Sequence, residues 1–169
     1  MARCLDANTF IEAKNRYYGL DFCPAFWDWL DAQRETGEIL CVRAIYDEIE
    51  GGGDDLAAWM RDRRAHAWLM AIDTEEVQQA YRQVVAHVEG RRGNPYTDAA
   101  IADFMAGADP WLIAFCLAGG HTLITHELPE PLSRRRVKIP DVCNALHVPW
   151  MNTFEALRQL NARFVLQNP

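Results

Sequence analysis

Apolar residues follow two patterns along the chain, short unbroken runs and longer stretches with helical spacing. The short runs are apolar on consecutive positions rather than alternate ones, which is typical of strands buried on both faces of a parallel sheet. The run at 67–72 fits either a strand or the tail of the preceding helix. The predicted strands span residues 2–7, 38–42, 67–72, 121–127 and 148–152.

The stretches with helical spacing carry recognisable start and stop signals. In the segment 108–120, Asp109 is the expected N-cap, Pro110 the first helical residue and Gly119 the terminator. Asp141 is likewise the simplest N-cap of a short helix, and a helix-like segment follows Asp6 directly. The other predicted helices span residues 23–37, 43–53, 54–64, 74–90, 96–107, 140–147 and 153–164.

Strands and helices therefore alternate along a chain of 169 residues, the size of one domain. This order predicts an α/β fold in which helices cover both faces of a mostly parallel sheet. In such sheets the functional site lies at the carboxyl ends of the strands, close to the point where the strand order reverses. We therefore treat residues 1–169 as a single domain and look for its chemistry at that edge.

Composition indicates a cytoplasmic protein. The five cysteines are scattered and form no CxxC pair, as expected for buried free thiols in a reducing compartment. Asp6 and Glu12 interrupt any apolar leader, and no apolar run approaches the roughly 20 residues that span a bilayer. The net charge of −7 argues against a protein that coats nucleic acid nonspecifically. It leaves room for local basic patches, at 61–64, 91–92 and 134–138.

Four acids stand at the ends of predicted elements or on the helix after the second strand: Asp6, Glu48, Asp109 and Glu127. If the sheet is doubly wound, these positions converge, and unpaired carboxylates in one cleft would repel one another strongly. A divalent cation removes that conflict, and ligands that are all oxygen favour Mg²⁺ or Mn²⁺. Each acid also has a plainer explanation, as a helix cap, a solvated surface residue or a loop acid.

A carboxylate metal site at a strand-end crevice suits phosphodiester hydrolysis by water. Asn8 is placed to hold a ligand or a phosphate, Thr125 to orient Glu127 or contact the scissile phosphate, and Asp141 to support the site. The stretch LDANT lacks the second acid of a phosphatase motif, and EGGGDD lacks the lysine and spacing of a P-loop. The basic run 134–138, with Arg134, Arg135, Arg136 and Lys138, or the run 61–64, would guide the phosphate backbone of a nucleic-acid substrate.

The ordered set of acids resembles a PIN domain. LDANTFI resembles the opening strand of that family with its first acid, Asp6, and AIYDEI the segment with the second, Glu48. ADPWLIAFCLAGGHTLITHE resembles the segments with the third and fourth acids, with Glu127 where many members have aspartate. Further stretches resemble an uncharacterised PIN-like branch of the VapC-type toxin ribonuclease superfamily: YYGLDFCPAFWDWL, DDLAAWM, VKIPDVCNAL and TFEALRQLNARF.

The resemblance implies a three-layer α/β/α sandwich, a Mg²⁺- or Mn²⁺-dependent endoribonuclease, and a toxin with an antitoxin partner; a homodimer is expected by analogy. One alternative is a PIN fold with a weak site that only binds RNA or a protein. Another keeps the chemistry but acts on structured DNA, which the short acidic chain makes less attractive.

Overall fold

The computed structural model describes residues 1–64 and 69–165. Five strands in this part of the chain form one parallel sheet with the order β3-β2-β1-β4-β5. The strands are β1 (Arg3–Leu5), β2 (Ile39–Val42), β3 (Leu69–Met70), β4 (Thr122–Ile124) and β5 (Trp150–Met151). The parallel sheet predicted from the sequence is confirmed, although each strand is shorter than its apolar run. The predicted run 67–72 yields β3, and its residues 67 and 68 lie outside the described residues.

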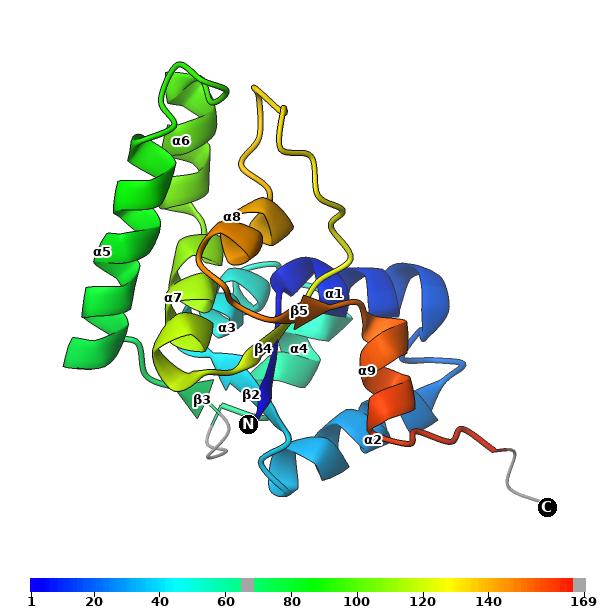
Figure 1. Ribbon diagram of the computed structural model, residues 1–169. Helices are drawn as coiled ribbons and strands as arrows, with labels where there is room; N and C mark the ends of the chain where they lie inside the picture. Colours follow the sequence, from blue (N-terminus) through cyan, green and yellow to red (C-terminus); the bar gives the residue numbers. More distant parts are fainter. Residues whose placement is uncertain (65–68, 166–169) are drawn as a thin grey trace.

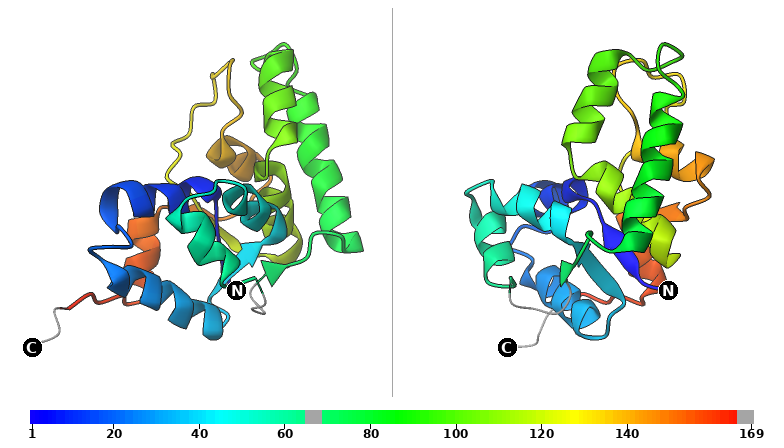
Figure 2. Two further views of the ribbon diagram at one scale, coloured as in Figure 1. Left: turned by 180° about the vertical axis from the view of Figure 1, so that it is seen from behind. Right: turned by 90° about the vertical axis from the view of Figure 1, so that its left-hand side faces the viewer.

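Helices cover both faces of the sheet (Figure 1). In the right-hand view of Figure 2, α2, α3 and α4 lie on one side of the strands, and α7 and α8 on the other. This division follows from the strand order, because the chain moves from β1 through β2 to β3 on one side of β1 and then through β4 to β5 on the other, and crossovers between parallel strands are right-handed as a rule. The helices are α1 (Ala7–Glu12), the π-helix η1 (Ala13–Tyr17), α2 (Pro24–Glu35), α3 (Arg43–Glu50), α4 (Asp55–Arg61), α5 (Glu75–Glu89), α6 (Asp98–Ala106), α7 (Asp109–Gly119), α8 (Ile139–Ala145) and α9 (Thr153–Gln159).

The central strands are buried on both faces, which explains why their sequences are apolar at every position. Cys4 in β1 pairs with Leu40 of β2 and Leu123 of β4 in register, and Cys4 and Leu123 have no exposed surface. The strand order reverses between β1 and β4, so the carboxyl ends of these two strands form the switch point of the sheet. All five cysteines are free thiols, and only Cys23 is not fully buried.

Two helix starts differ from the prediction. Ala108, rather than Asp109, is the N-cap of α7, so Asp109 is the first helical residue and its side chain makes no capping bond. Helix α7 continues through Gly119, and Gly120 ends it with a left-handed backbone (φ 61°). Lys138 is the N-cap of α8, which places Asp141 in the first turn instead of at the cap. The π-helix η1 had no counterpart in the prediction.

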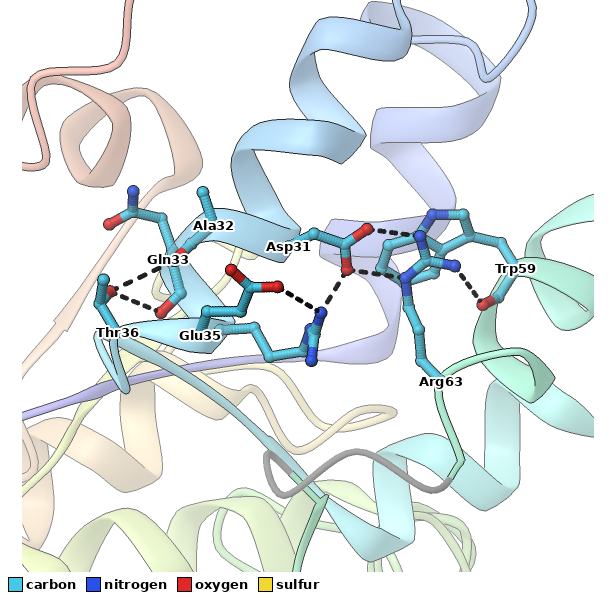
Figure 3. A network of polar contacts seen from close by, with 8 residues as sticks. Asp31, Ala32, Gln33, Glu35, Thr36, Trp59 and Arg63 are labelled. Carbon is cyan, nitrogen blue, oxygen red and sulfur yellow. Dashed lines mark hydrogen bonds and ion pairs between the residues drawn. The ribbon is translucent and has the colours of Figure 1, made fainter.

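An ion-pair network joins α2 to the end of α4 (Figure 3). Both carboxylate oxygens of Asp31 accept hydrogen bonds from Arg63, whose guanidinium also lies 3.8 Å from the centre of the Trp59 ring. Arg34 donates a further bond of 3.2 Å to Asp31. Burial alone would raise the pKa of Asp31, but the hydrogen bonds and charges of the two arginines outweigh it and lower that pKa.

The helices α5 and α6 extend beyond the carboxyl edge of the sheet, and the segment 125–138 rises beside them before it enters α8 (Figures 1 and 2). Within the described residues no single helix is long and apolar enough to cross a membrane; α6 and α7 reach that length and composition only together, across a bend of 68°. The carboxyl edge below these extensions is where the predicted acids lie.

Candidate metal centre

Asp6 lies at the switch point and is almost completely buried, with 1% of its surface exposed. It follows β1 directly and caps α1, because its Oδ1 accepts a 2.6 Å hydrogen bond from the backbone N–H of Thr9. Its Oδ2 accepts a 2.6 Å bond from the hydroxyl of Thr125, the residue that follows β4. Burial raises the pKa of Asp6, and these hydrogen bonds only partly oppose the increase.

Thr125 connects two of the predicted acids. Its hydroxyl donates to Asp6 and accepts a 3.1 Å hydrogen bond from the backbone N–H of Glu127. Its own side chain is fully buried, so this geometry is fixed by packing as well as by hydrogen bonds. The Thr9 hydroxyl adds a 3.3 Å bond to the carbonyl of Ile124, which holds the start of α1 against the end of β4.

Asp109, the first residue of α7, is half-buried beside these groups. Burial raises its pKa to about 7, and the negative charges of Asp6, Glu127 and Glu48 add to the effect, while Arg136 opposes it. No group in residues 1–64 or 69–165 hydrogen-bonds its carboxylate. Three acids from separate segments therefore act electrostatically on Asp109.

Glu48 approaches this group from α3. It is exposed, whereas its neighbours Ile45 and Ile49 on the same helix face the core. Its charge reaches Asp109, as the pKa of that residue shows. The exposed carboxylate is free to change rotamer without disturbing the core.

Glu127 has a second role that the sequence did not suggest. Its Oε2 accepts a 2.9 Å hydrogen bond from the backbone N–H of Ile139, at the start of α8. Its Oε1 lies 3.2 Å from the ammonium group of Lys138, and both side chains are less than one-fifth exposed. Glu127 therefore holds the C-terminal end of the segment 125–138 at the start of α8. Lys138, which was predicted to bind RNA, is paired with this acid.

Among the described residues, neither Asp141 nor Asn8 hydrogen-bonds Asp6 or Asp109, although the charge of Glu127 acts on Asp141. Both oxygens of Asp141 accept hydrogen bonds from the backbone N–H of Glu130, at 3.2 and 3.0 Å. These hydrogen bonds connect the first half of the segment 125–138, which contains Glu130, to α8. Asn8 is exposed in the first turn of α1.

Two of the predicted arginines border the acids. A cavity of about 390 Å³ lies between α6 and the segment 125–138, and Asp109, Glu127, Arg135 and Arg136 line it. Asp103 of α6 also lines this cavity and was missed, because nothing in its sequence context distinguishes it from a solvated helix residue. Arg134 is exposed and does not line the cavity.

The donor chemistry fits a hard divalent cation. Asp6, Glu48, Asp109 and Glu127 offer only oxygen, and a cation would favour the charged form of Asp109, which burial first and the neighbouring acids second disfavour. In the described part of the chain, no three Asp, Glu, His or Cys side chains are yet placed so that they could hold an ion as they stand. Rotation of the exposed Glu48 and release of Glu127 from Lys138 are the changes that would bring more oxygens together.

The comparison with protein families gives a clear assignment. The model of the family described as "Domain of unknown function (DUF4411)" matches residues 3–164. The chain belongs to the DUF4411 family. No curated protein matches this member of DUF4411 at a significant level.

Solved structures share the fold of this DUF4411 protein. One is a chain of the crystal structure of VapBC2 from Rickettsia felis bound to a DNA fragment from their promoter. It aligns with a TM-score of 0.57 and 12% sequence identity, and the alignment covers 90% of this chain and 98% of that chain. A chain of the crystal structure of FitAcB from Neisseria gonorrhoeae aligns with a TM-score of 0.50 and 17% identity, again over 90% and 98%. The predicted α/β fold with its central parallel sheet is thereby confirmed, and the PIN-like resemblance holds at the level of the fold.

Proposed function

We propose that this DUF4411 protein is a Mg²⁺- or Mn²⁺-dependent endoribonuclease and the toxin of a toxin–antitoxin-like pair. The observation that carries the proposal is Asp109. Its carboxylate has no hydrogen-bond partner among the described residues, borders a cavity, and has its pKa raised by burial and by three other acids. Perturbed acids that converge in a cleft are typical of functional sites.

In this proposal Asp6, Glu48, Asp109 and, once released from Lys138, Glu127 hold the ion. When bound, the ion supplies the positive charge that activates water and stabilises a phosphodiester under attack. Thr125 keeps Asp6 oriented through its 2.6 Å hydrogen bond. Arg135 and Arg136 bind phosphates of the RNA backbone from the cavity wall.

The toxin role and the protein partner rest on the fold. Chains with this fold belong to the VapBC2 and FitAcB structures. A small antitoxin protein is the partner that this likeness suggests, and a homodimer is the simplest assembly. We also expect a cytoplasmic location, because four of the five free thiols are buried and reduced.

The test is a cleavage assay with the purified protein. Fluorescent RNA is incubated with Mn²⁺, with EDTA, and with an Asp6→Asn variant in Mn²⁺. We expect endonucleolytic products only for the unaltered protein with Mn²⁺. Products that persist in EDTA or in the variant contradict the mechanism. A DNA strand and a DNA duplex of the same sequence, run beside the RNA, show whether structured DNA is the substrate instead.

One observation favours a second candidate, a protein that binds RNA or a protein partner without cutting. Glu127 is already ion-paired with the ammonium group of Lys138, and its other oxygen accepts a hydrogen bond from the N–H of Ile139, so a cation must displace Lys138 to bind it in this conformation. This candidate predicts no change in melting temperature with Mn²⁺. A bound ion would raise the melting temperature, because it binds the folded state only.

A further inference from the structure

A second cavity lies next to the acids, between α3 and the corner where α6 meets α7. It has a volume of about 450 Å³, and Glu48 and Trp111 line it together with the small residues Ala44, Ala106, Gly107 and Ala108. It is separate from the cavity of about 390 Å³ between α6 and the segment 125–138, which Asp109, Arg135 and Arg136 line. We call that one the arginine-lined cavity. Ala108 lines the second cavity and Asp109 the arginine-lined cavity, and they are consecutive residues, so the walls of the two cavities adjoin at the start of α7.

The two cavities differ in charge. The arginine-lined cavity presents Arg135 and Arg136, whereas no described residue that lines the second cavity is a cation. Its one charged group is the carboxylate of Glu48, which repels phosphate. A strand of RNA that crosses the centre would therefore place its phosphates toward the arginines and an uncharged part toward the second cavity.

The walls of the second cavity suit a flat ring. Trp111 is half-buried and stacks on Tyr81 of α5, with ring centres 3.8 Å apart and planes 17° apart. A tryptophan held in this way offers a rigid apolar surface, and unpaired bases bind proteins by stacking on such side chains. The other uncharged residues of the lining, Ala44, Ala106, Gly107 and Ala108, are small and take up little of the space.

We propose that this cavity between Glu48 and Trp111 binds one unpaired base of the RNA substrate, next to the phosphodiester at the metal centre. The inference rests on the proposed function for its choice of RNA. It adds a base-binding subsite and makes Trp111 the residue that positions the substrate. A base inside a duplex cannot enter, because stacking in the cavity requires that it be unpaired.

Gly107 allows the cavity to be filled with little strain. Its backbone has φ −87°, and an added Cβ would meet only the carbonyl oxygens of Phe104 and Asp103, at 3.7 and 3.8 Å. Gly107→Leu therefore adds a side chain at the wall of the cavity without an evident clash. Gly51→Leu is the matched control, because its Cβ has similar clearances of 3.6 and 3.7 Å and Gly51 does not line the cavity.

The experiment measures binding, so that it is independent of catalysis. Fluorescence anisotropy gives the Kd of a labelled RNA pentamer, and of five versions that each lack one base, with Ca²⁺ in place of Mn²⁺. We expect the unaltered protein to lose about tenfold in affinity when one particular base is missing. We expect Gly107→Leu to bind the intact pentamer about tenfold more weakly and to show no further loss without that base. Gly51→Leu should match the unaltered protein.

Trp111→Leu is the second variant, and melting temperatures check that each variant is folded. It should also remove the sensitivity to the missing base. Equal affinity for all the pentamers, an unchanged Kd in Gly107→Leu, or no binding of the pentamer would overturn the inference. Cleavage of the same RNA in Mn²⁺ is recorded separately. Cleavage without any effect of base removal contradicts the base subsite alone, and the binding pattern without cleavage contradicts the nuclease alone.

Discussion

The hydroxyl of Thr125 donates a 2.6 Å hydrogen bond to Oδ2 of Asp6, and both residues are buried at the carboxyl ends of neighbouring strands. The two residues are 119 positions apart in the sequence. Asp6 thereby has both oxygens engaged, one by the helix that it caps and one by the strand beside it. The centre of the candidate site is therefore built into the framework of the sheet.

The first prediction concerns this bond. Thr125→Val removes the hydroxyl at nearly constant volume, leaves a buried carboxylate short of a partner, and should lower the free energy of unfolding by about 1.5–3 kcal/mol. Urea denaturation measures the change. Thr125→Ser, which keeps the hydroxyl, should recover most of the loss. Equal stability of the valine variant and the unaltered protein would contradict the importance of this bond.

The second prediction concerns Asp109 in the metal-free protein. Its pKa is higher in the folded protein, about 7, than the ordinary value of 3.8 in the unfolded chain. The folded state thus holds the proton more tightly, and this residue makes the protein less stable as the pH rises from about 4 to about 7.

Asp109→Asn removes that penalty. In EDTA at pH 8 the variant should be more stable than the unaltered protein, by at most roughly 4 kcal/mol, the equivalent of the shift in pKa. The gap should shrink when the pH is lowered to 5. Denaturation curves at the two pH values measure it, and a gap that is absent at pH 8, or that grows toward pH 5, would show that Asp109 does not carry the excess charge. Mn²⁺ should stabilise the unaltered protein and have a smaller effect on the variant.

The third prediction concerns Lys138. Its ammonium group lies 3.2 Å from Glu127 and competes with a cation for that carboxylate. Lys138→Met should therefore increase the affinity for Mn²⁺, by about fivefold if the charge contributes on the order of 1 kcal/mol. Isothermal titration calorimetry measures the affinity. Arg134→Met is the matched control, because it also removes one positive charge but from an exposed site outside the cavity. An unchanged or weaker affinity in Lys138→Met would contradict this competition, and an unchanged affinity would mean that Glu127 serves α8 alone.

The fourth prediction concerns the network between α2 and α4. Asp31→Asn should lower the free energy of unfolding at pH 7 by roughly 1–3 kcal/mol, because Arg63 and Arg34 lose a charged partner. The pKa of Asp31 is lowered in the folded protein. Its contribution to stability is therefore complete above the unfolded pKa of 3.8 and is lost as the pH falls through the lower, folded value.

Asp28→Asn, an exposed position on the same helix, is the control for the fourth prediction. It should leave the free energy of unfolding almost unchanged at pH 7 and at pH 3. If the loss in Asp31→Asn were the same at pH 7 and at pH 3, the ion pair would not be its cause.

The sheet could be predicted from the sequence because the signals that mark its strands are local. Buried parallel strands are apolar at every position, and Asp6 stands where β1 ends and α1 begins. Asp109 was placed one residue too early in its helix, since a proline in the next position fits either register. The π-helix η1 was missed because no sequence pattern distinguishes it from an ordinary helix end.

The roles of the other acids depend on long-range contacts. Glu127 contacts the start of α8 because the segment 125–138 turns back on itself, and no spacing rule encodes that return. The sequence around Asp141 predicts a helix cap, yet its carboxylate accepts a hydrogen bond from the N–H of Glu130, in the first half of the segment 125–138. The order of the acids along the chain thus predicted where negative charges lie close together. It did not predict which of the acids also form hydrogen bonds that hold the segment 125–138 in place.

The most direct test of the central claim is a crystal structure grown with Mn²⁺ and examined by anomalous scattering. The account predicts an ion between Asp6 and Asp109, with carboxylate oxygens at about 2.1 Å and Glu48 turned toward it. Crystals that hold Mn²⁺ elsewhere, or that show no anomalous peak beside Asp109 at saturating Mn²⁺, would contradict the account.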